Sequence, residues 1–311
     1  MRVRVDGREV ELSNLDKVLY PAVGFTKAEV IDYYTRVAPV LLPHLTGRAL
    51  TRIRYPDGVD APHFFEKNAP ASTPDWVRRE TLPAPGSSRG RAMLDYVVVD
   101  DLPALVWVAN LASLELHTPQ WKIEALDSME SVAPARPDRL VMDLDPGPPA
   151  GLRECSEVAL RLRDRLAADG LDAYPKLSGK KGMQLCCPIA ATQSAADVSA
   201  YAKRIAEELA AQTPQRVTSQ MAKKLRSGKV FIDWSQNSAA KTTVSPYSLR
   251  AMSTPTVSVP LTWDEVESGA VTPADYPPEV VLARIDEYGD LMAPLLDGGP
   301  EVPAQHPPFR P

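Results

Sequence analysis

The 311-residue chain has few of the residues that build thiolate metal sites and disulfide frameworks. It holds three cysteines and four histidines, and neither a Cys-x-x-Cys nor a His-Glu-x-x-His spacing occurs. Zinc is held by clustered cysteine and histidine, so a zinc site is not indicated. Cys186 and Cys187 are adjacent in a β-favouring run, which predicts reduced thiols in the core rather than disulfides.

Long apolar runs are lacking as well. The longest, residues 102–111, is far shorter than the roughly 20 residues that cross a bilayer. No apolar signal core follows a basic start, because residues 1–14 alternate charged and apolar side chains as in a first hairpin. We therefore expect a cytoplasmic protein that has no membrane partner.

The chain does contain a regular alternation of helical and strand patterns. Apolar residues recur at helical spacing over 26–45, where Thr26 is a candidate cap, and over 154–169 and 195–212. Strand-like runs cover residues 49–55, 96–99, 140–145, 183–188 and 230–234. This order predicts a mixed α/β (α+β) fold.

The length and composition favour one large unit. A chain of 311 residues with 44% hydrophobic content exceeds one average domain but can bury a single core. We expect one compact module with two lobes over residues 1–293. Proline and glycine dominate residues 294–311, which predicts a C-terminal tail that is disordered or lies along the surface.

Asp143 and Asp145 are the most informative residues. They stand at i and i+2 in the run Leu-Val-Met-Asp-Leu-Asp-Pro, so both project from one face of a strand whose other face is apolar. Asp233 stands in a second β-favouring run, Val-Phe-Ile-Asp-Trp. Because a buried carboxylate needs a cation or a donor, three acids on two strands indicate Mg²⁺ or Mn²⁺. Taken alone, the Asp-x-Asp pair could also be two solvated acids at a strand end.

A second polar feature is the turn Ser-Gly-Lys-Lys-Gly-Met-Gln at residues 178–184. Two glycines let the backbone approach an anion, and a hydroxyl and lysines can donate to it. The spacing is not that of a Walker P-loop, and the turn alone could equally be a basic hairpin. The segment from Asp233 to Arg250 is also dense in hydrogen-bond donors.

The charge is unevenly distributed. The formal net charge is −5, which is not typical of a general nucleic-acid binder. Residues 214–250, however, contain seven Lys and Arg against Asp233 alone, whereas residues 251–311 contain ten acids against two arginines. This asymmetry predicts a local phosphate-binding face beside an acidic C-terminal region.

Together these features resemble one family, the polymerase domain of bacterial DNA ligase D, in the archaeo-eukaryotic primase superfamily. The resemblance implies a two-lobed primase-polymerase catalytic core with an RRM-like sheet that carries the acidic triad. Because the chain stops at Pro311 without ligase or phosphoesterase sequence, it looks like the stand-alone gap-filling enzymes of actinobacteria. The resemblance rests on six ordered blocks, at residues 15–21, 64–67, 115–121, 143–147, 178–184 and 233–250.

The resemblance implies template-directed nucleotidyl transfer that fills short gaps during DNA repair. A primer 3′-hydroxyl would attack the α-phosphate of an NTP or dNTP, with Asp143, Asp145 and Asp233 as catalytic residues that hold two Mn²⁺ or Mg²⁺ ions. Without the resemblance, His117 is more typical of a hydrogen-bonded structural histidine. The implied nucleotide-binding residues are His117, Ser178, Lys181, Gln184, Gln236 and Arg250.

The resemblance also implies a DNA-binding set. Lys17 and Lys27 match a pair that holds the 5′-phosphate beyond a gap, although both could be ordinary solvated lysines. Phe64 and Phe65 match aromatic residues that face the template. Adjacent residues of a strand point to opposite faces, so we expect at most one of them to stack on DNA while the other packs inward, unless the backbone is irregular there. Arg226 would contact the template backbone.

Gln184 departs from the family, whose turn usually ends in a histidine. Glutamine can donate a hydrogen bond, but it cannot carry a positive charge. The change either weakens catalysis or is neutral, with Lys180 beside Lys181 supplying the missing charge.

The expected partners follow from this function. They are gapped or broken DNA with a 5′-phosphate, NTP or dNTP, a DNA ligase and end-binding repair proteins. We expect the protein to be a monomer in the bacterial cytosol. Two alternatives remain open: a DNA gap- or end-binding module with weakened catalysis, and an Asp-x-Asp glycosyltransferase that uses Mn²⁺ and a nucleotide-sugar.

Overall fold

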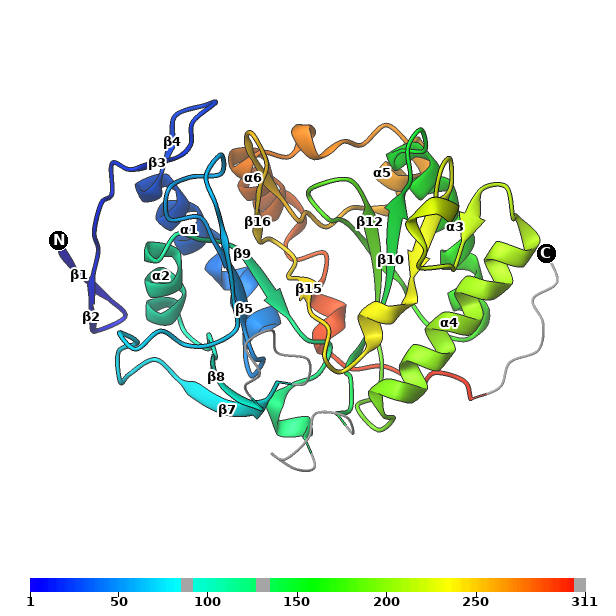
Figure 1. The fold of residues 1–311 in the computed structure, drawn as a ribbon, viewed down its shortest axis with the longest axis horizontal. Helices are drawn as coiled ribbons and strands as arrows, with labels where there is room; N and C mark the ends of the chain where they lie inside the picture. The colour runs from blue at the N-terminus through cyan, green and yellow to red at the C-terminus, as the bar shows by residue number, and fades with distance from the viewer. Residues whose placement is uncertain (85–91, 127–134, 305–311) are drawn as a thin grey trace.

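The computed structural model describes residues 1–84, 92–126 and 135–304. Two main sheets lie side by side and contribute to one hydrophobic core (Figure 1). Within these ranges, no helix is both long and apolar enough to span a membrane. The predicted mixed α/β fold is confirmed.

The five-stranded sheet carries the acids at its centre. Its order is β11(Tyr174–Leu177), β12(Met183–Pro188), β10(Arg139–Pro146), β14(Val230–Asp233) and β13(Val217–Thr218). Neighbouring strands are antiparallel except for the parallel pair β13 and β14. The helices α3(Leu152–Ala168) and α4(Ala195–Gln212) pack against β10 on this side of the molecule (Figure 1).

β10 is buried along most of its length. Leu140, Met142 and Leu144 are fully buried in the main core, as their alternation in the sequence predicted. Val141 on the other face is also buried, so the strand needs no solvated side until its last residues. The strand ends with Pro146, which has no N–H to continue the ladder.

The four-stranded sheet lies in the half of the molecule that contains the N-terminus (Figure 1). Its order is β15(Thr243–Val244), β9(Ser113–Thr118), β5(Thr51–Arg54) and β6(Phe64–Glu66). The helices α1(Lys27–Leu45) and α2(Leu102–Asn110) pack against each other beside it (Figure 1). Thr26 caps α1 and exchanges hydrogen bonds with Glu29 in a capping box, so the predicted helix start is confirmed.

Short hairpins and helices complete the described chain. Residues 2–11 form the expected hairpin, and another two-stranded sheet, β16 with β17, places Arg250 near β9. The remaining elements are β1(Arg2–Val5), β2(Arg8–Glu11), β3(Val18–Tyr20), β4(Phe25–Thr26), β7(Arg79–Pro83), β8(Met93–Val97), β16(Leu249–Ala251), β17(Pro255–Val257), α5(Trp263–Ser268), α6(Pro278–Tyr288) and the 3₁₀ helices η1(Ile123–Ala125), η2(Lys223–Leu225), η3(Trp234–Asn237), η4(Pro273–Asp275) and η5(Ala293–Leu296).

The beginning of the predicted tail lies against the folded body. Leu295 is buried beside Val141, and the buried Val302 donates its backbone N–H to Gln193 Oε1 at 2.7 Å. Residues 305–311 lie outside the described ranges, and the division at residue 293 stays a prediction. All three cysteines are free and buried, which confirms the predicted reduced core thiols.

Candidate active site

Three carboxylates meet at the centre of the five-stranded sheet. Asp143 and Asp145 project from the same face of β10, and the ladder places Asp143 directly opposite Asp233 of β14. One oxygen from each of these three residues lies within 4.8 Å of the other two. An all-oxygen acidic donor set of this kind suits Mg²⁺ or Mn²⁺.

The electrostatics of the triad favour a bound cation. Burial and the neighbouring charges of Asp145 and Asp233 raise the pKa of Asp143 to about 7. The pKa of Asp145 is raised by burial and by Asp233. Without a cation, therefore, the three carboxylates repel one another, and a divalent ion would relieve that repulsion.

Neighbouring amides and a hydroxyl hold the carboxylates in place. Gln184 Nε2 donates to Asp143 Oδ1 at 3.0 Å, and Gln236 Nε2 donates to Asp233 Oδ2 at 3.0 Å. Ser235 Oγ donates to the other oxygen of Asp233 at 2.6 Å. Gln184 Oε1 is buried without a partner among the described residues. Water on a bound ion would supply the donor that this acceptor lacks.

The glycine-rich turn lies directly against the acidic strand. It joins β11 to β12, and Ser178 Oγ accepts the N–H of Gly182 at 3.2 Å. Gly179 has a φ of +76°, and a Cβ there would lie 2.6 Å from Arg250 Cγ. A Cβ on Gly182 would lie 2.2 Å from the carbonyl oxygen of Leu144. Glycine is therefore required at both positions by close approach.

These parts enclose a cleft of about 340 Å³. Arg250 reaches the turn, where its Nη1 donates to the carbonyl oxygen of Ser178 at 2.7 Å. Lys181 is exposed and has no hydrogen bond or ion pair with the described residues. The cleft is lined by Asp143, Asp145 and all six residues that the resemblance assigned to the nucleotide: His117, Ser178, Lys181, Gln184, Gln236 and Arg250.

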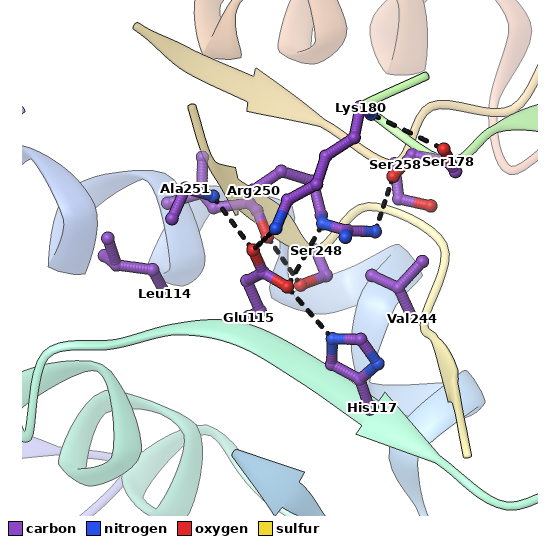
Figure 2. A network of polar contacts seen from close by, with 12 residues as sticks. Leu114, Glu115, His117, Ser178, Lys180, Val244, Ser248, Arg250, Ala251 and Ser258 are labelled. Atoms are coloured by element: carbon purple, nitrogen blue, oxygen red, sulfur yellow. Dashed lines mark hydrogen bonds and ion pairs between the residues drawn. The ribbon is translucent and has the colours of Figure 1, made fainter. Parts of the chain in front are cut away.

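Sequence reasoning missed Glu115 and the role of Lys180. Glu115 of β9 is fully buried, and Lys180 Nζ lies 2.7 Å from its Oε1 (Figure 2). Lys180 is thus paired with a buried acid, and its replacement of a histidine's charge at Gln184 stays a prediction. An acid inside the run Leu-Glu-Leu-His is the same signal that identified Asp233, and it could have been used.

Lys17 and Lys27 lie together at the start of α1. The backbone N–H of Lys27 donates to the carbonyl oxygen of Lys17 at 2.8 Å. Lys17 is half-buried and pairs with Asp57, whereas Lys27 is buried and donates to the carbonyl oxygen of Ser13. Burial and the charge of Lys17 lower the pKa of Lys27 to about 8. The view of Lys27 as an ordinary solvated lysine is therefore wrong.

The prediction that Phe64 or Phe65 packs inward is also wrong. Their side chains are 53% and 59% exposed, and both belong to β6 at the edge of the four-stranded sheet. A strand is buried on one face only where another layer covers that face, and the exposure shows that neither face is covered here. Both rings are available to a partner.

Arg226 lies close to the acids. Its guanidinium carbon Cζ lies 3.7 Å from the centre of the Phe231 ring, and its Nη1 lies 4.0 Å from Asp145 Oδ2. Gly147 permits this position, because a Cβ there would lie 2.0 Å from the carbonyl oxygen of Arg226. The basic segment around η2 thus reaches the edge of the triad.

Comparisons with known proteins agree with this geometry. A family profile described as "LigD, primase-polymerase domain" matches residues 26–292. The "Multifunctional non-homologous end joining protein LigD" of Mycolicibacterium smegmatis is 45% identical over 286 residues, and the alignment covers 92% of this chain and 36% of that protein. The "Bifunctional non-homologous end joining protein LigD" of Bacillus subtilis is 32% identical over 282 residues, covering 90% and 43%.

A solved structure is similar over almost its whole length. It is described as "Polymerase Domain from Mycobacterium tuberculosis Ligase D in complex with DNA", with a TM-score of 0.86 and 44% identity. The match covers 94% of this chain and 99% of that one. The chain spans about a third of the length of the mycobacterial curated relatives that it matches.

Proposed function

The chain belongs to the LigD primase-polymerase domain family, and we propose that it is a nucleotidyltransferase that fills short gaps in broken DNA under the direction of a template. The observation that carries this proposal is the convergence of three carboxylates, two of which line a cleft that also contains a glycine-rich turn and Arg250. The similar mycobacterial polymerase domain was solved in complex with DNA, which supports a nucleic-acid substrate. Membership of this family argues against a glycosyltransferase.

Asp143, Asp145 and Asp233 would hold two divalent ions, Mn²⁺ or Mg²⁺. The raised pKa of Asp143 and the unpartnered Oε1 of Gln184 both fit a site that is completed by a hydrated cation. Such ions stabilise the attacking and the leaving oxygens of an in-line displacement when they are bound. Gln184, Ser235 and Gln236 would keep the carboxylates in the required orientation.

The turn beside the acids and the residues that contact it would bind the triphosphate. Ser178 Oγ accepts backbone N–H groups, so its own proton is available to a phosphate oxygen. Arg250 keeps Nη2 without a partner among the described residues, and Lys181 is exposed at the cleft. A planar guanidinium and a mobile ammonium would thus share the phosphate charges. His117 and Gln236 would lie beside the incoming nucleotide, and pyrophosphate would leave.

Surfaces outside the cleft would position the DNA. Lys17 and Lys27 would hold the 5′-phosphate beyond the gap, where a phosphate contact fixes the register without reading sequence. Phe64 and Phe65 are both exposed, and one of them would stack on a template base, since adjacent strand residues point to opposite faces. Arg226 would approach the template backbone beside Asp145. The enzyme would act as a monomer, with a DNA ligase and end-binding proteins completing the repair.

One observation favours a second candidate, a gap- or end-binding module with weakened catalysis. Gln184 stands where the family usually has a histidine, and its amide is neutral and engaged with Asp143. This residue preserves the hydrogen bond to the acid but adds no positive charge to the triphosphate site.

Incorporation on a gapped duplex separates the two candidates. The substrate carries a one-base gap and a 5′-phosphate, and the four nucleotides are supplied with Mn²⁺ in ribo and deoxy form. We expect templated extension by the unaltered protein. Asp145→Ala should abolish extension and leave gap binding within about twofold, because it removes an ion ligand and no proposed DNA contact. Gap binding without extension by the unaltered protein would instead establish the binding module.

A further inference from the structure

Glu115 is a fully buried carboxylate at the centre of the four-stranded sheet. A buried carboxylate without donors would cost several kcal/mol, so its surroundings must compensate for its burial. Although burial alone would raise the pKa of Glu115, the hydrogen bond from His117 and the charges of Arg250 and Lys180 hold it well below its usual range. Glu115 is therefore a permanent negative charge inside the protein.

Four groups converge on its two oxygens (Figure 2). Oε1 lies 2.7 Å from Lys180 Nζ and accepts the N–H of Ala251 at 3.1 Å. Oε2 lies 3.1 Å from His117 Nε2 and 3.3 Å from Arg250 Nε. These groups come from β9, from the turn between β11 and β12, and from β16, which are far apart in the sequence. One carboxylate therefore joins three separate elements.

The three side chains held by Glu115 all line the proposed triphosphate cleft. Two of them are cations, which would repel each other if the carboxylate between them were absent. His117 is kept neutral, since burial lowers its pKa. Glu115 Oε2 accepts a hydrogen bond from His117 Nε2. That nitrogen therefore carries the proton, and Nδ1 of His117 is left as an acceptor. The resulting cluster has one net positive charge and a fixed arrangement before any nucleotide binds.

We propose that Glu115 is a positioning residue that assembles Arg250, Lys180 and His117 into the triphosphate-binding wall of the cleft before nucleotide binds. The inference rests on the proposed function and deepens it. Glu115 cannot touch the nucleotide, but it would determine the geometry of the nucleotide site. Preorganised donors bind an anion more tightly, since less ordering remains to be done on binding.

Glu115→Gln tests the proposal with an almost isosteric change. An amide offers one oxygen, so its NH₂ group must face either Arg250 or Lys180, and that cation loses its partner. We expect the dissociation constant of a non-incorporable triphosphate with Mn²⁺ to rise about ten- to a hundredfold, as for the loss of a charge-assisted contact. In kinetics the change should appear mainly in KM, and affinity for gapped DNA should stay within about twofold.

Glu115→Asp and Asp169→Asn serve as matched variants. Aspartate keeps the charge but is one methylene too short to reach all four donors, so it should also weaken triphosphate binding. Asp169 is another buried acid, paired with Arg165 and hydrogen-bonded to Tyr201 away from the cleft, and its change should leave triphosphate affinity unaltered. A Glu115→Gln protein that is folded and binds the triphosphate as tightly as the unaltered protein, or more tightly, would overturn the proposal.

A double-mutant cycle distinguishes positioning from general stability. In a Lys180→Ala, Arg250→Ala background, Glu115→Gln should change triphosphate affinity by less than about twofold, because both cations that Glu115 positions are gone and only the neutral His117 remains. If Glu115→Gln weakened triphosphate binding as much in that background as in the unaltered protein, Glu115 would not act through Lys180 and Arg250.

A measurement on the unaltered protein covers the case in which the Glu115 variants do not fold. The chain has only four histidines, so ¹⁵N shifts can be assigned to His117. Glu115 requires the proton on Nε2. A proton on Nδ1 with a bare Nε2 would contradict the arrangement. Because this readout needs no nucleotide, it stands even if the protein proves to bind none, a result that would reject the proposed function separately.

Discussion

Asp143 links the acidity of the site to the stability of the metal-free protein. Its pKa is raised from 3.8 to about 7 by burial and by two neighbouring carboxylates. The folded protein thus holds this proton more tightly than the unfolded chain does. The contribution of this group to stability is therefore greatest at low pH and is lost as the pH rises from about 4 to about 7.

Asp143→Asn should remove this loss. We expect the metal-free variant to be more stable than the unaltered protein by roughly 1–3 kcal/mol near pH 8, and the difference to vanish near pH 4. Urea unfolding with a chelator at both pH values measures it. Asp75→Asn, at a fully exposed acid, controls for the loss of one charge. A variant less stable than the unaltered protein at pH 8 would show that Asp143 supports the fold instead.

Gln184 bears on metal affinity through its hydrogen bond to Asp143. Gln184→Leu leaves that carboxylate oxygen without its donor and removes the acceptor beside it. Since residues that orient metal ligands typically contribute ten- to a hundredfold to affinity, we expect Mn²⁺ binding to weaken about tenfold or more. Electron paramagnetic resonance of free Mn²⁺ gives the affinity. Gln193→Leu, at an amide that contacts Val302 instead, should bind Mn²⁺ normally.

Single residues were predictable from the sequence where their surroundings made them anomalous. The three aspartates stand in apolar strands, and that contrast is visible without coordinates. The role of Glu115 was not visible, because its partners Lys180 and Arg250 come from distant segments that only the fold brings together. The exposure of both Phe64 and Phe65 depends on β6 being an edge strand, which a local pattern does not reveal.

At the level of elements, the turn between β11 and β12 joins the acidic strand to Arg250. Gly179 and Gly170 have nearly equal backbone angles, with φ of +76° and +78°. A Cβ on Gly179 would meet Arg250 Cγ and the carbonyl oxygen of Val257 at 2.6 and 2.7 Å, whereas the space at Gly170 is open. The two positions therefore share a backbone strain and differ in their surroundings.

Gly179→Ala should displace Arg250 and weaken triphosphate binding about tenfold or more, with a lowered melting temperature. Gly170→Ala should cost about 1 kcal/mol of stability from backbone strain alone and leave triphosphate affinity unchanged. Calorimetry for stability and a nucleotide titration for affinity separate the two effects. Equal triphosphate affinity in both variants would mean that the close approach at Gly179 does not matter for the site.

Elements with strong local signals agreed best with the sequence. The range 195–212 is α4 as predicted, and the range 183–188 is β12, because each combines a clear apolar period with clear end signals. Strands of two residues, such as β13 and β15, carry no period of their own. Their pairing is imposed by the neighbouring strands β14 and β9, so it emerges only from the assembled sheets.

For the whole molecule, the distribution of charge should govern DNA affinity. A net charge of −5 opposes association with DNA, so the basic segment must act locally. We expect the affinity for gapped DNA to fall steeply between about 50 and 200 mM salt. Lys224→Ala, at an exposed residue of η2, should reduce the slope of log K against log salt by about one.

Fluorescence anisotropy of a labelled gapped duplex measures this slope. Lys203→Ala is the matched control, because Lys203 lies on α4 and pairs with Glu207. Its slope should equal that of the unaltered protein. If both variants changed the slope equally, the electrostatic contribution would be spread over the molecule and not confined to the basic segment.

The overall architecture was predictable from six ordered blocks and not from any single motif. Each block is short, but together they resemble one family, and that resemblance implies which strands and turns meet. The dimensions of the cleft were not predictable, since they depend on β16 and β9 lying against each other across the junction of the sheets.

The buried cysteines make the protein suitable for site-specific labelling. Cys155, Cys186 and Cys187 are inaccessible, and burial raises the pKa of each thiol, which keeps all three poorly reactive. A cysteine introduced at exposed Phe65 would therefore be the preferred target of a maleimide dye. A fluorophore there would report the binding of a DNA end in real time, and the native cysteines would not have to be replaced first.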